Sequence, residues 1–315
     1  MPVDPALVSL LEAINVADGP ITAGMSPAEF RELFRSMAAI DGEPVAVASV
    51  ADRTVPGPAG EIPVRVVVPE VAGGGTPTGV LVWFHGGGWV IGDLDTSESA
   101  ARRLAALAGC VVVSVDYRLA PEDPAPAGLA DCWAATTWVA DHRDELGVPG
   151  GPMAVGGDSA GGNLAALVAL RAAGEGRPTL AHQLLVYPAT DLTMSCPSIT
   201  ENGEGYFLTR ETMGWFTGHH LSGGADPADP GVSPLFASDD ALAGVAPALV
   251  IVAGFDPLRD EGRAYGEKLA AAGISAQVVE YPTMIHGFFQ MAGVTPLAIE
   301  AATVAAEALR AAFAR

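Results

Sequence analysis

The hydrophobic positions of the chain begin with a helical repeat. Leu7 and Leu11 lie one helical turn apart, and Phe30 and Phe34 form a second stripe of the same spacing. Ser26-Pro27 resembles a helix start, with a capping serine and proline at the first helical position. Residues 1–43 are therefore predicted to form helices that pack over the following part of the chain.

After residue 44 the pattern changes to strands. Two alternating stretches, 45–55 and 61–68, flank Pro56-Gly57-Pro58-Ala59-Gly60, which predicts a hairpin. Six short, mostly apolar runs then predict strands that are covered on both faces: 80–84, 110–115, 153–155, 184–186, 249–253 and 276–280. Helical stretches lie between most of them or follow the last: about 94–108, 128–146, 160–174, 257–272 and 296–313.

This alternation predicts an α/β fold with a mostly parallel, eight-stranded sheet and helices on both faces. The connection between Tyr187 and Pro247 is about sixty residues long, far beyond the usual loop in such folds. It contains one predicted helix, 209–221. We expect a helical cap segment at 1–43 and a catalytic domain at 44–315 that carries a cap insertion at about 190–240.

Composition narrows the function classes. Half of the 315 residues are hydrophobic, 17% are charged, and the formal net charge is −21. Such a chain is expected to be globular, and its acidity argues against binding nucleic acid or anionic lipid. No apolar run approaches the roughly 18 residues of a membrane span, so no stable membrane association is expected.

The cysteines and histidines suggest neither a disulfide framework nor a metal site. Cys110, Cys132 and Cys196 are widely spaced, and the adjacent His219 and His220 point apart. No secretory leader is visible at the N-terminus. We therefore expect a cytoplasmic protein without a metal site.

The main candidate for a catalytic motif is Gly157-Asp158-Ser159-Ala160-Gly161, which lies between a predicted apolar strand and a predicted Ala/Leu-rich helix. In that context, Gly-x-Ser-x-Gly indicates a nucleophile elbow, in which a sharp turn exposes the serine at the edge of the sheet. The five residues alone would also fit a glycine-rich turn with no catalytic role. The elbow therefore needs a base, an acid and oxyanion donors elsewhere in the chain.

The base and the acid are expected at the same sheet edge, where the parallel strands end. His286 follows the last strand, and Asp256 is the first acid after the strand at 249–253. Asp260, one helical turn further on, is the alternative acid. The order Ser159, Asp256, His286 matches the order of serine, acid and histidine in α/β-hydrolases.

A glycine-rich loop follows the predicted strand at 80–84. In His85-Gly86-Gly87-Gly88-Trp89, three glycines let the backbone approach a substrate closely and direct N–H groups toward it. A phosphate-binding loop is disfavoured because the spacing and the lysine of such loops are absent. His85 is expected to hold the loop through hydrogen bonds.

Together these segments resemble the bacterial hormone-sensitive-lipase family of α/β-hydrolases, in its Gly-Asp-Ser-Ala-Gly branch. Five motifs carry the resemblance, in unbroken order from about residue 45 to the C-terminus: His85-Gly86-Gly87-Gly88-Trp89, Asp116-Tyr117-Arg118-Leu119-Ala120-Pro121-Glu122, Gly157-Asp158-Ser159-Ala160-Gly161-Gly162-Asn163, Asp256-Pro257-Leu258-Arg259-Asp260-Glu261 and His286-Gly287-Phe288. One departure is Asp123, where members of the family often have histidine.

The resemblance implies a carboxylic-ester hydrolase acting on short- to medium-chain acyl esters. By analogy, Ser159 is the nucleophile, His286 the base and Asp256 the residue that orients it, and this mechanism requires no metal and no organic cofactor. The same analogy gives an oxyanion hole formed by the N–H groups of Gly86, Gly87 and Ala160. It also suggests a homodimer through the last strand and helix, although nothing in residues 274–313 requires one.

The cap is expected to line or roof the acyl pocket with Phe30, Phe34, Met213, Trp215 and Phe216. Each of these side chains could equally well only pack between the cap helices. An amidase, lactonase or carbamate hydrolase could use the same triad, because the pocket selects the leaving group. A ligand receptor and a lyase on this scaffold are disfavoured by His286 and by Ser159, respectively. A true long-chain lipase is disfavoured because no long apolar surface helix stands out.

Overall fold

A computed structural model describes residues 2–15 and 24–315 of the chain. Its centre is one eight-stranded sheet in the order β1-β2-β4-β3-β5-β6-β7-β8. The strands are β1 (Ser49–Gly57), β2 (Gly60–Val68), β3 (Val80–Phe84), β4 (Val111–Val115), β5 (Met153–Asp158), β6 (His182–Val186), β7 (Ala248–Phe255) and β8 (Ala276–Ile285). The β1–β2 hairpin joins β4 antiparallel, and the other pairs are parallel. This confirms the predicted α/β fold.

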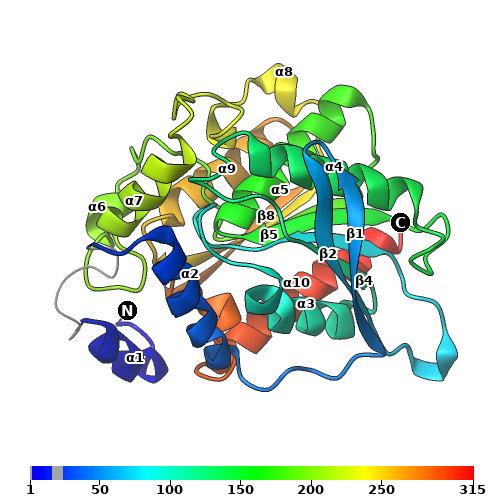
Figure 1. The fold of residues 1–315 in the computed structure, drawn as a ribbon, viewed down its shortest axis with the longest axis horizontal. Coiled ribbons are helices and arrows are strands. Elements are labelled where there is room, and N and C mark those ends of the chain that lie inside the picture. Colours follow the sequence, from blue (N-terminus) through cyan, green and yellow to red (C-terminus); the bar gives the residue numbers. More distant parts are fainter. Residues whose placement is uncertain (1, 16–23) are drawn as a thin grey trace.

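Helices cover both faces of this sheet (Figure 1). On one face lie α3 (Leu94–Ala108) and α10 (Pro296–Phe313), and on the other lie α4 (Ala127–Asp141), α5 (Ala160–Glu175) and α9 (Arg259–Ala271). Alternate strand residues feed two separate cores: Leu81 and Trp83 join the α3–α10 side, while Val82 and Phe84 join the α5 side. Two buried faces explain why the central strands are apolar throughout.

Several predicted boundaries shift. The first strand begins at Ser49 and not at Val45. The helix predicted at 128–146 ends at Asp141, where His142 Nδ1 lies 2.8 Å from the Trp138 carbonyl oxygen. Strand β8 runs five residues beyond its predicted end, to Ile285, after a register irregularity against β7 at Ala253/Phe255. His286 therefore follows directly on a strand end.

The cap elements come from two distant parts of the chain. The N-terminal part contains α1 (Pro5–Asn15), α2 (Pro27–Ser36) and the 3₁₀-helix η1 (Met37–Asp41). The connection between β6 and β7 contains α6 (Ser198–Glu201), α7 (Arg210–His220), η3 (Pro234–Phe236) and α8 (Asp239–Leu242). Short 3₁₀ turns η2 (Ala72–Gly74) and η4 (Phe288–Gln290) complete the chain. Residues 16–23 of the predicted N-terminal segment lie outside the described residues.

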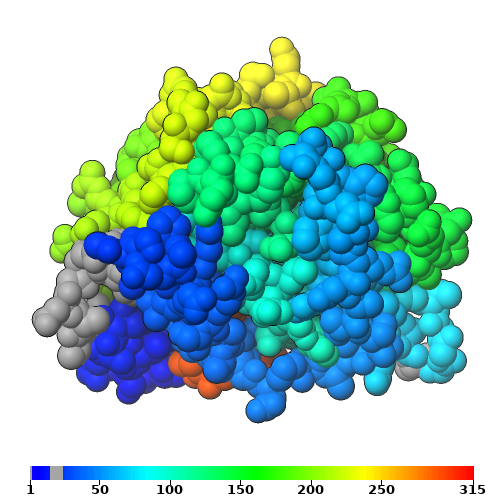
Figure 2. Space-filling model, viewed as in Figure 1, coloured from blue at the N-terminus to red at the C-terminus, as the bar shows by residue number. Residues whose placement is uncertain are grey.

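Helices α2 and α7 pack together at one end of the molecule (Figures 1 and 2). Ser26 caps α2 through a reciprocal capping box with Glu29, and the predicted Pro27 is the first helical residue. Phe30 of α2 lies 5.6 Å from the ring centres of both Trp215 and Phe216 of α7. Among the described residues, no helix combines the length and apolar character needed to cross a membrane.

Candidate active site

Ser159 occupies the sharp turn between β5 and α5. Its backbone has φ +57° and ψ −118°, a conformation that non-glycine residues rarely adopt. The turn is tight enough that a Cβ at Gly161 would clash with the Phe84 carbonyl oxygen, and one at Gly157 with the Gly161 backbone. The two glycines of the motif are thus required by space, and the strain lifts the serine side chain clear of the sheet edge.

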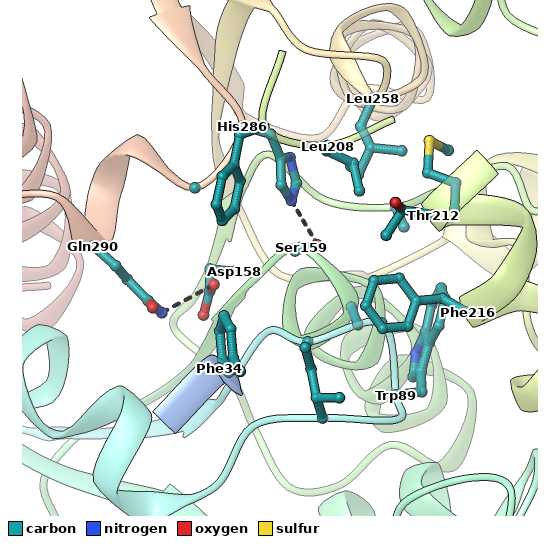
Figure 3. A pocket seen from close by; sticks show the side chains of 18 of the residues that line it. Phe34, Trp89, Asp158, Ser159, Leu208, Thr212, Phe216, Leu258, His286 and Gln290 are labelled. Carbon is teal, nitrogen blue, oxygen red and sulfur yellow. Dashed lines mark hydrogen bonds between the residues drawn. The ribbon is translucent and has the colours of Figure 1, made fainter. Parts of the chain in front are cut away.

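The three residues predicted to act together are connected by hydrogen bonds. His286 Nε2 lies 2.9 Å from Ser159 Oγ, and His286 Nδ1 lies 2.8 Å from Asp256 Oδ2 (Figure 3 shows the first contact). Asp256 is fully buried, and its second oxygen accepts from the Leu258 N–H at 2.8 Å. Because the carboxylate only accepts, Nδ1 carries the proton and Nε2 is free to accept from the serine hydroxyl.

The alternative acid, Asp260, lies elsewhere. Its Oδ2 accepts from the Ser198 N–H at 2.9 Å, and its Oδ1 accepts from Arg259 Nε at 2.8 Å. Arg259 and the Ser198 N–H lower the pKa of Asp260 against the opposing effect of burial. The structure therefore brings Asp256 to His286, and Asp260 ties α9 to the cap helix α6.

The hydrogen bonds of the glycine loop bear on the proposed oxyanion donors. The Gly86 N–H donates to Asp158 Oδ1 at 3.0 Å, so it is already engaged within the protein. Gly87 and Gly88, in contrast, line the same cavity as Ser159 and Ala160. Within the described part of the chain, the N–H groups of Gly87, Gly88 and Ala160 have no hydrogen-bond partner. Gly88 replaces Gly86 as a candidate donor.

Two buried side chains hold the glycine loop. Burial raises the pKa of Asp158 to about 7, against the Gly86 N–H and the nearby His286, and its Oδ2 accepts from Gln290 Nε2 at 3.1 Å. Burial lowers the pKa of His85 to about 4, so its ring is neutral, and its Nδ1 lies 2.7 Å from the Gly86 carbonyl oxygen. Tyr117 stacks on this ring at 4.3 Å and donates to the His85 carbonyl. His85 thus has the structural position predicted for it.

The cavity beside Ser159 has a volume of about 150 Å³ and is bounded by cap residues. Four of the five predicted pocket residues line it: Phe30, Phe34, Met213 and Phe216. Trp215 is not among the residues that line it, which fits the alternative of packing between cap helices. Its ring packs behind the lining, edge-on to Phe30, Phe216 and His219.

Aliphatic, aromatic and polar side chains surround Ser159 in the cavity (Figure 3). Leu208, Leu258 and Thr212 stand on one side of Ser159, whereas Asp158 and Gln290 stand on the other. The described residues contain no group of three His, Cys, Asp or Glu side chains arranged to hold a metal ion. The arrangement offers a nucleophile, a base and unoccupied N–H donors around one space.

Three residues of the site were not among those predicted from the sequence: Gly88, Gln290 and Asp41. Gly88 lies inside the predicted glycine loop, but only the bond from Gly86 to Asp158 reveals which N–H groups stay free. Gln290 and the carboxylate of Asp41 also line the cavity. Gln290 follows the last motif by only two residues, which was a weak signal, and Asp41 lies in no motif at all.

Fold and site define the class of protein: an α/β-hydrolase. A family model described as "alpha/beta hydrolase fold" matches residues 81–290. The chain therefore belongs to this family, in its hormone-sensitive-lipase-like branch, as the sequence motifs predict.

Particular relatives are named esterases. The chain is 48% identical to the carboxylic ester hydrolase LipN of Mycobacterium tuberculosis over 253 residues, which are 78% of this chain and 66% of LipN. It is 44% identical to esterase LipI of the same organism over 261 residues, 83% of this chain and 81% of LipI. A solved hyperthermophilic esterase from Pyrobaculum calidifontis superposes with a TM-score of 0.89 at 39% identity, covering 99% of each chain.

Proposed function

We propose that this carboxylic ester hydrolase cleaves short- to medium-chain acyl esters through an acyl-enzyme on Ser159. The observation that carries the proposal is the continuous hydrogen-bond chain from Ser159 through His286 to the buried Asp256. A serine hydroxyl is a poor nucleophile unless a base accepts its proton, and this chain supplies a base in the correct tautomer.

In the first half-reaction His286 Nε2 accepts the Ser159 proton as Oγ attacks the ester carbonyl carbon. Asp256 holds the ring and stabilises the imidazolium that forms. The oxyanion is stabilised by the N–H groups of Gly87, Gly88 and Ala160. The last of these opens helix α5, whose N-terminal dipole favours negative charge.

The first half-reaction ends when His286 donates its proton to the departing alcohol oxygen, which breaks the ester bond and leaves the acyl-enzyme. In the second half-reaction the acyl group leaves Ser159. Water then donates a proton to His286 as its oxygen attacks the acyl carbon, and the collapse of that intermediate returns the proton to Ser159. The cycle needs no oxidant, reductant or cofactor.

Substrate size is proposed from the cavity. Its limited volume and the aliphatic and aromatic side chains of the cap favour an acyl group of short or medium length. The test is a panel of p-nitrophenyl esters from two to sixteen carbons, with a p-nitroanilide, a lactone and a carbamate as controls. We expect the best kcat/KM among the shorter esters. Faster cleavage of the anilide, lactone or carbamate would assign the chain to that class instead.

The domain division, location and assembly complete the proposal. We assign 1–43 and about 190–240 to the cap, and the rest of 44–315 to the catalytic domain.

A cytoplasmic location is supported by free thiols at Cys110, Cys132 and Cys196. A homodimer through β8 and α10 is the proposed assembly, and light scattering of the purified protein tests it: a monomeric mass would refute the dimer.

A further inference from the structure

A buried carboxylate from the N-terminal cap segment lines the cavity and has no part in the proposed chemistry. Asp41, the last residue of η1, is 6% exposed and lines the same cavity as Ser159. Asp158 and Gln290 line that cavity as well. Polar groups therefore extend from the nucleophile toward η1.

Only one oxygen of the Asp41 carboxylate is occupied. Oδ1 accepts from Arg103 Nη2 in a buried ion pair and from the Ala292 N–H at 3.2 Å. Oδ2 accepts no hydrogen bond from any residue in 2–15 or 24–315. Asp41 lines the cavity, and a carboxylate oxygen that has no protein donor can accept a hydrogen bond from a ligand there, so Oδ2 is a position where a ligand donor would be stabilised.

The carboxylate cannot easily turn away from the cavity. Arg103 is itself buried, and its Nη1 donates to the Phe289 carbonyl oxygen at 3.2 Å. The Gly293 N–H donates to the Ile40 carbonyl oxygen at 3.0 Å, which fixes η1 against the segment after η4. The free oxygen is thus held in place before any ligand arrives, which is the condition for a specific polar contact.

The pairing with Arg103 also determines which donor fits. The Asp41–Arg103 pair carries no net charge, so it offers an acceptor without attracting a cation strongly. A neutral hydroxyl group matches that environment better than an ammonium group, whose desolvation would not be repaid.

We propose that Asp41 Oδ2 is a specificity subsite that accepts a hydrogen bond from a hydroxyl group of the substrate, remote from the scissile carbonyl. This rests on the proposed ester hydrolysis at Ser159 and narrows its substrate class to hydroxylated esters. Asp41 acts on selection among esters and has no role in bond making or breaking.

The first test uses the wild-type chain and matched ethyl esters whose remote carbon bears a hydroxyl, a ketone or only hydrogens. A second series carries the same groups on the alcohol part of butyrate esters. Released acid is titrated at pH 8, because burial raises the pKa of Asp41 and the assay must keep it ionised. We expect about tenfold higher kcat/KM for the hydroxyl over the ketone at one chain length, a difference of about 1.4 kcal/mol.

The preference for the hydroxyl ester is expected in one of the two series. That series shows whether the acyl part or the alcohol part of the substrate reaches Asp41. Equal or slower hydrolysis of every hydroxyl ester in both series would overturn the subsite. No hydrolysis of any ester in either series would instead refute ester hydrolysis itself, so the two failures are distinguishable.

The second test is Asp41→Asn. Two donors hold Oδ1, so the amide oxygen should keep that position and turn the Nδ2 donor into the cavity. The hydroxyl-to-ketone ratio of kcat/KM is then expected to fall about tenfold. Asp131→Asn is the matched control: Asp131 is 2% exposed and paired with Arg118 but lies outside the cavity, so this ratio should not change. A folded Asp41→Asn enzyme that kept the wild-type ratio would overturn the assignment.

Discussion

The two walls of the cavity are constructed by different means. On the sheet side, Ser159, Asp256 and His286 each follow a strand end, and their side chains are joined by hydrogen bonds of 2.8 and 2.9 Å. On the cap side, Phe30 and Phe216 meet as stacked rings whose centres lie 5.6 Å apart. Backbone geometry positions the chemistry, whereas side-chain packing shapes the space that receives the substrate.

The contrast between a hydrogen-bonded sheet side and a packed cap side predicts how strongly mutations on each side affect activity. A hydrogen-bonded catalytic group has no substitute, and its loss removes a step of the reaction. An apolar wall is redundant, because neighbouring side chains can partly fill a lost contact. Substitutions on the sheet side should therefore reduce activity by orders of magnitude, and those on the cap side mainly change which ester is preferred.

The largest effect is expected for Ser159→Ala. Removing the nucleophile should lower kcat for p-nitrophenyl butyrate by at least about 10⁴-fold. The fold should survive, because the substitution removes one hydroxyl and relieves no packing. Ser222→Ala, at an exposed residue, is the control. Substantial residual hydrolysis by a correctly folded Ser159→Ala protein would contradict the nucleophile assignment.

The second prediction separates the two acids. Asp256→Asn replaces the acceptor at His286 Nδ1 and should cost about 10³-fold to 10⁴-fold in kcat by favouring the wrong imidazole tautomer. Asp260→Asn should cost less than about tenfold in kcat, since Asp260 contacts Ser198 and Arg259 instead. The same ester assay compares kcat of the two variants. A larger loss for Asp260→Asn than for Asp256→Asn would assign Asp260 as the residue that orients His286.

The third prediction concerns Gly88, where the two walls touch. Its φ is +57°, and a Cβ there would clash with the Phe216 ring. Gly88→Ala should lower kcat about 10²-fold by displacing an oxyanion donor. Adding Phe216→Ala should recover part of that loss by opening space for the methyl group. A double variant no better than the single one would show that backbone strain at residue 88, and not the clash, sets the cost.

A smaller effect is expected from Phe34→Ala on the cap side. Phe34 lines the cavity near Asp158 (Figure 3), and truncating it should enlarge the space for substrate. We expect kcat/KM to fall a few-fold for butyrate esters while the preferred acyl chain becomes longer. The ester panel measures this shift. An unchanged chain-length profile would remove Phe34 from the pocket wall.

The smallest effect on activity at neutral pH is expected for His220→Gln. His220 stacks on Trp89 at 4.3 Å, and burial lowers its pKa to about 4 from an ordinary 6.5. The unfolded chain binds a proton between these values that the folded chain does not. Folded-state stability is therefore lost as pH falls from 6.5 to 4, by up to about 3 kcal/mol.

Thermal unfolding at several pH values tests this linkage. Between pH 7 and pH 5 the wild-type midpoint should fall more than that of His220→Gln, which has no ring to protonate. Parallel curves for the two proteins would show that His220 does not contribute to acid sensitivity.

The sequence predicted the sheet side well because two independent signals coincide there. Short apolar runs mark the strands, and Ser159, Asp256 and His286 fall just beyond their ends. Asp260 stayed an alternative because the two acids are only one helical turn apart in the segment after this strand. Only the three-dimensional path of the chain after Phe255 decides which carboxylate reaches the histidine.

Other features of the site depend on contacts that no local pattern encodes. Gly86 and Gly88 are glycines of the same loop, and they differ because the Gly86 N–H bonds the side chain of Asp158, 72 residues further along the chain. Trp215 and Phe216 are neighbours on one helix, so they point about 100° apart, and only the packing of α2 against α7 fixes which one faces the cavity.

The long connection between β6 and β7 has a consequence for how this molecule can diversify. The two strands pair directly, from Gln183 with Ala248 to Val186 with Ile251, so the sheet does not depend on what lies between them. The entropic cost of closing a loop rises only slowly with its length. Length changes in the parts of this connection that do not contact the Asp256 segment, as Ser198 and Asn202 do, should therefore alter the cap and its substrate preference while the sheet and the triad stay in place.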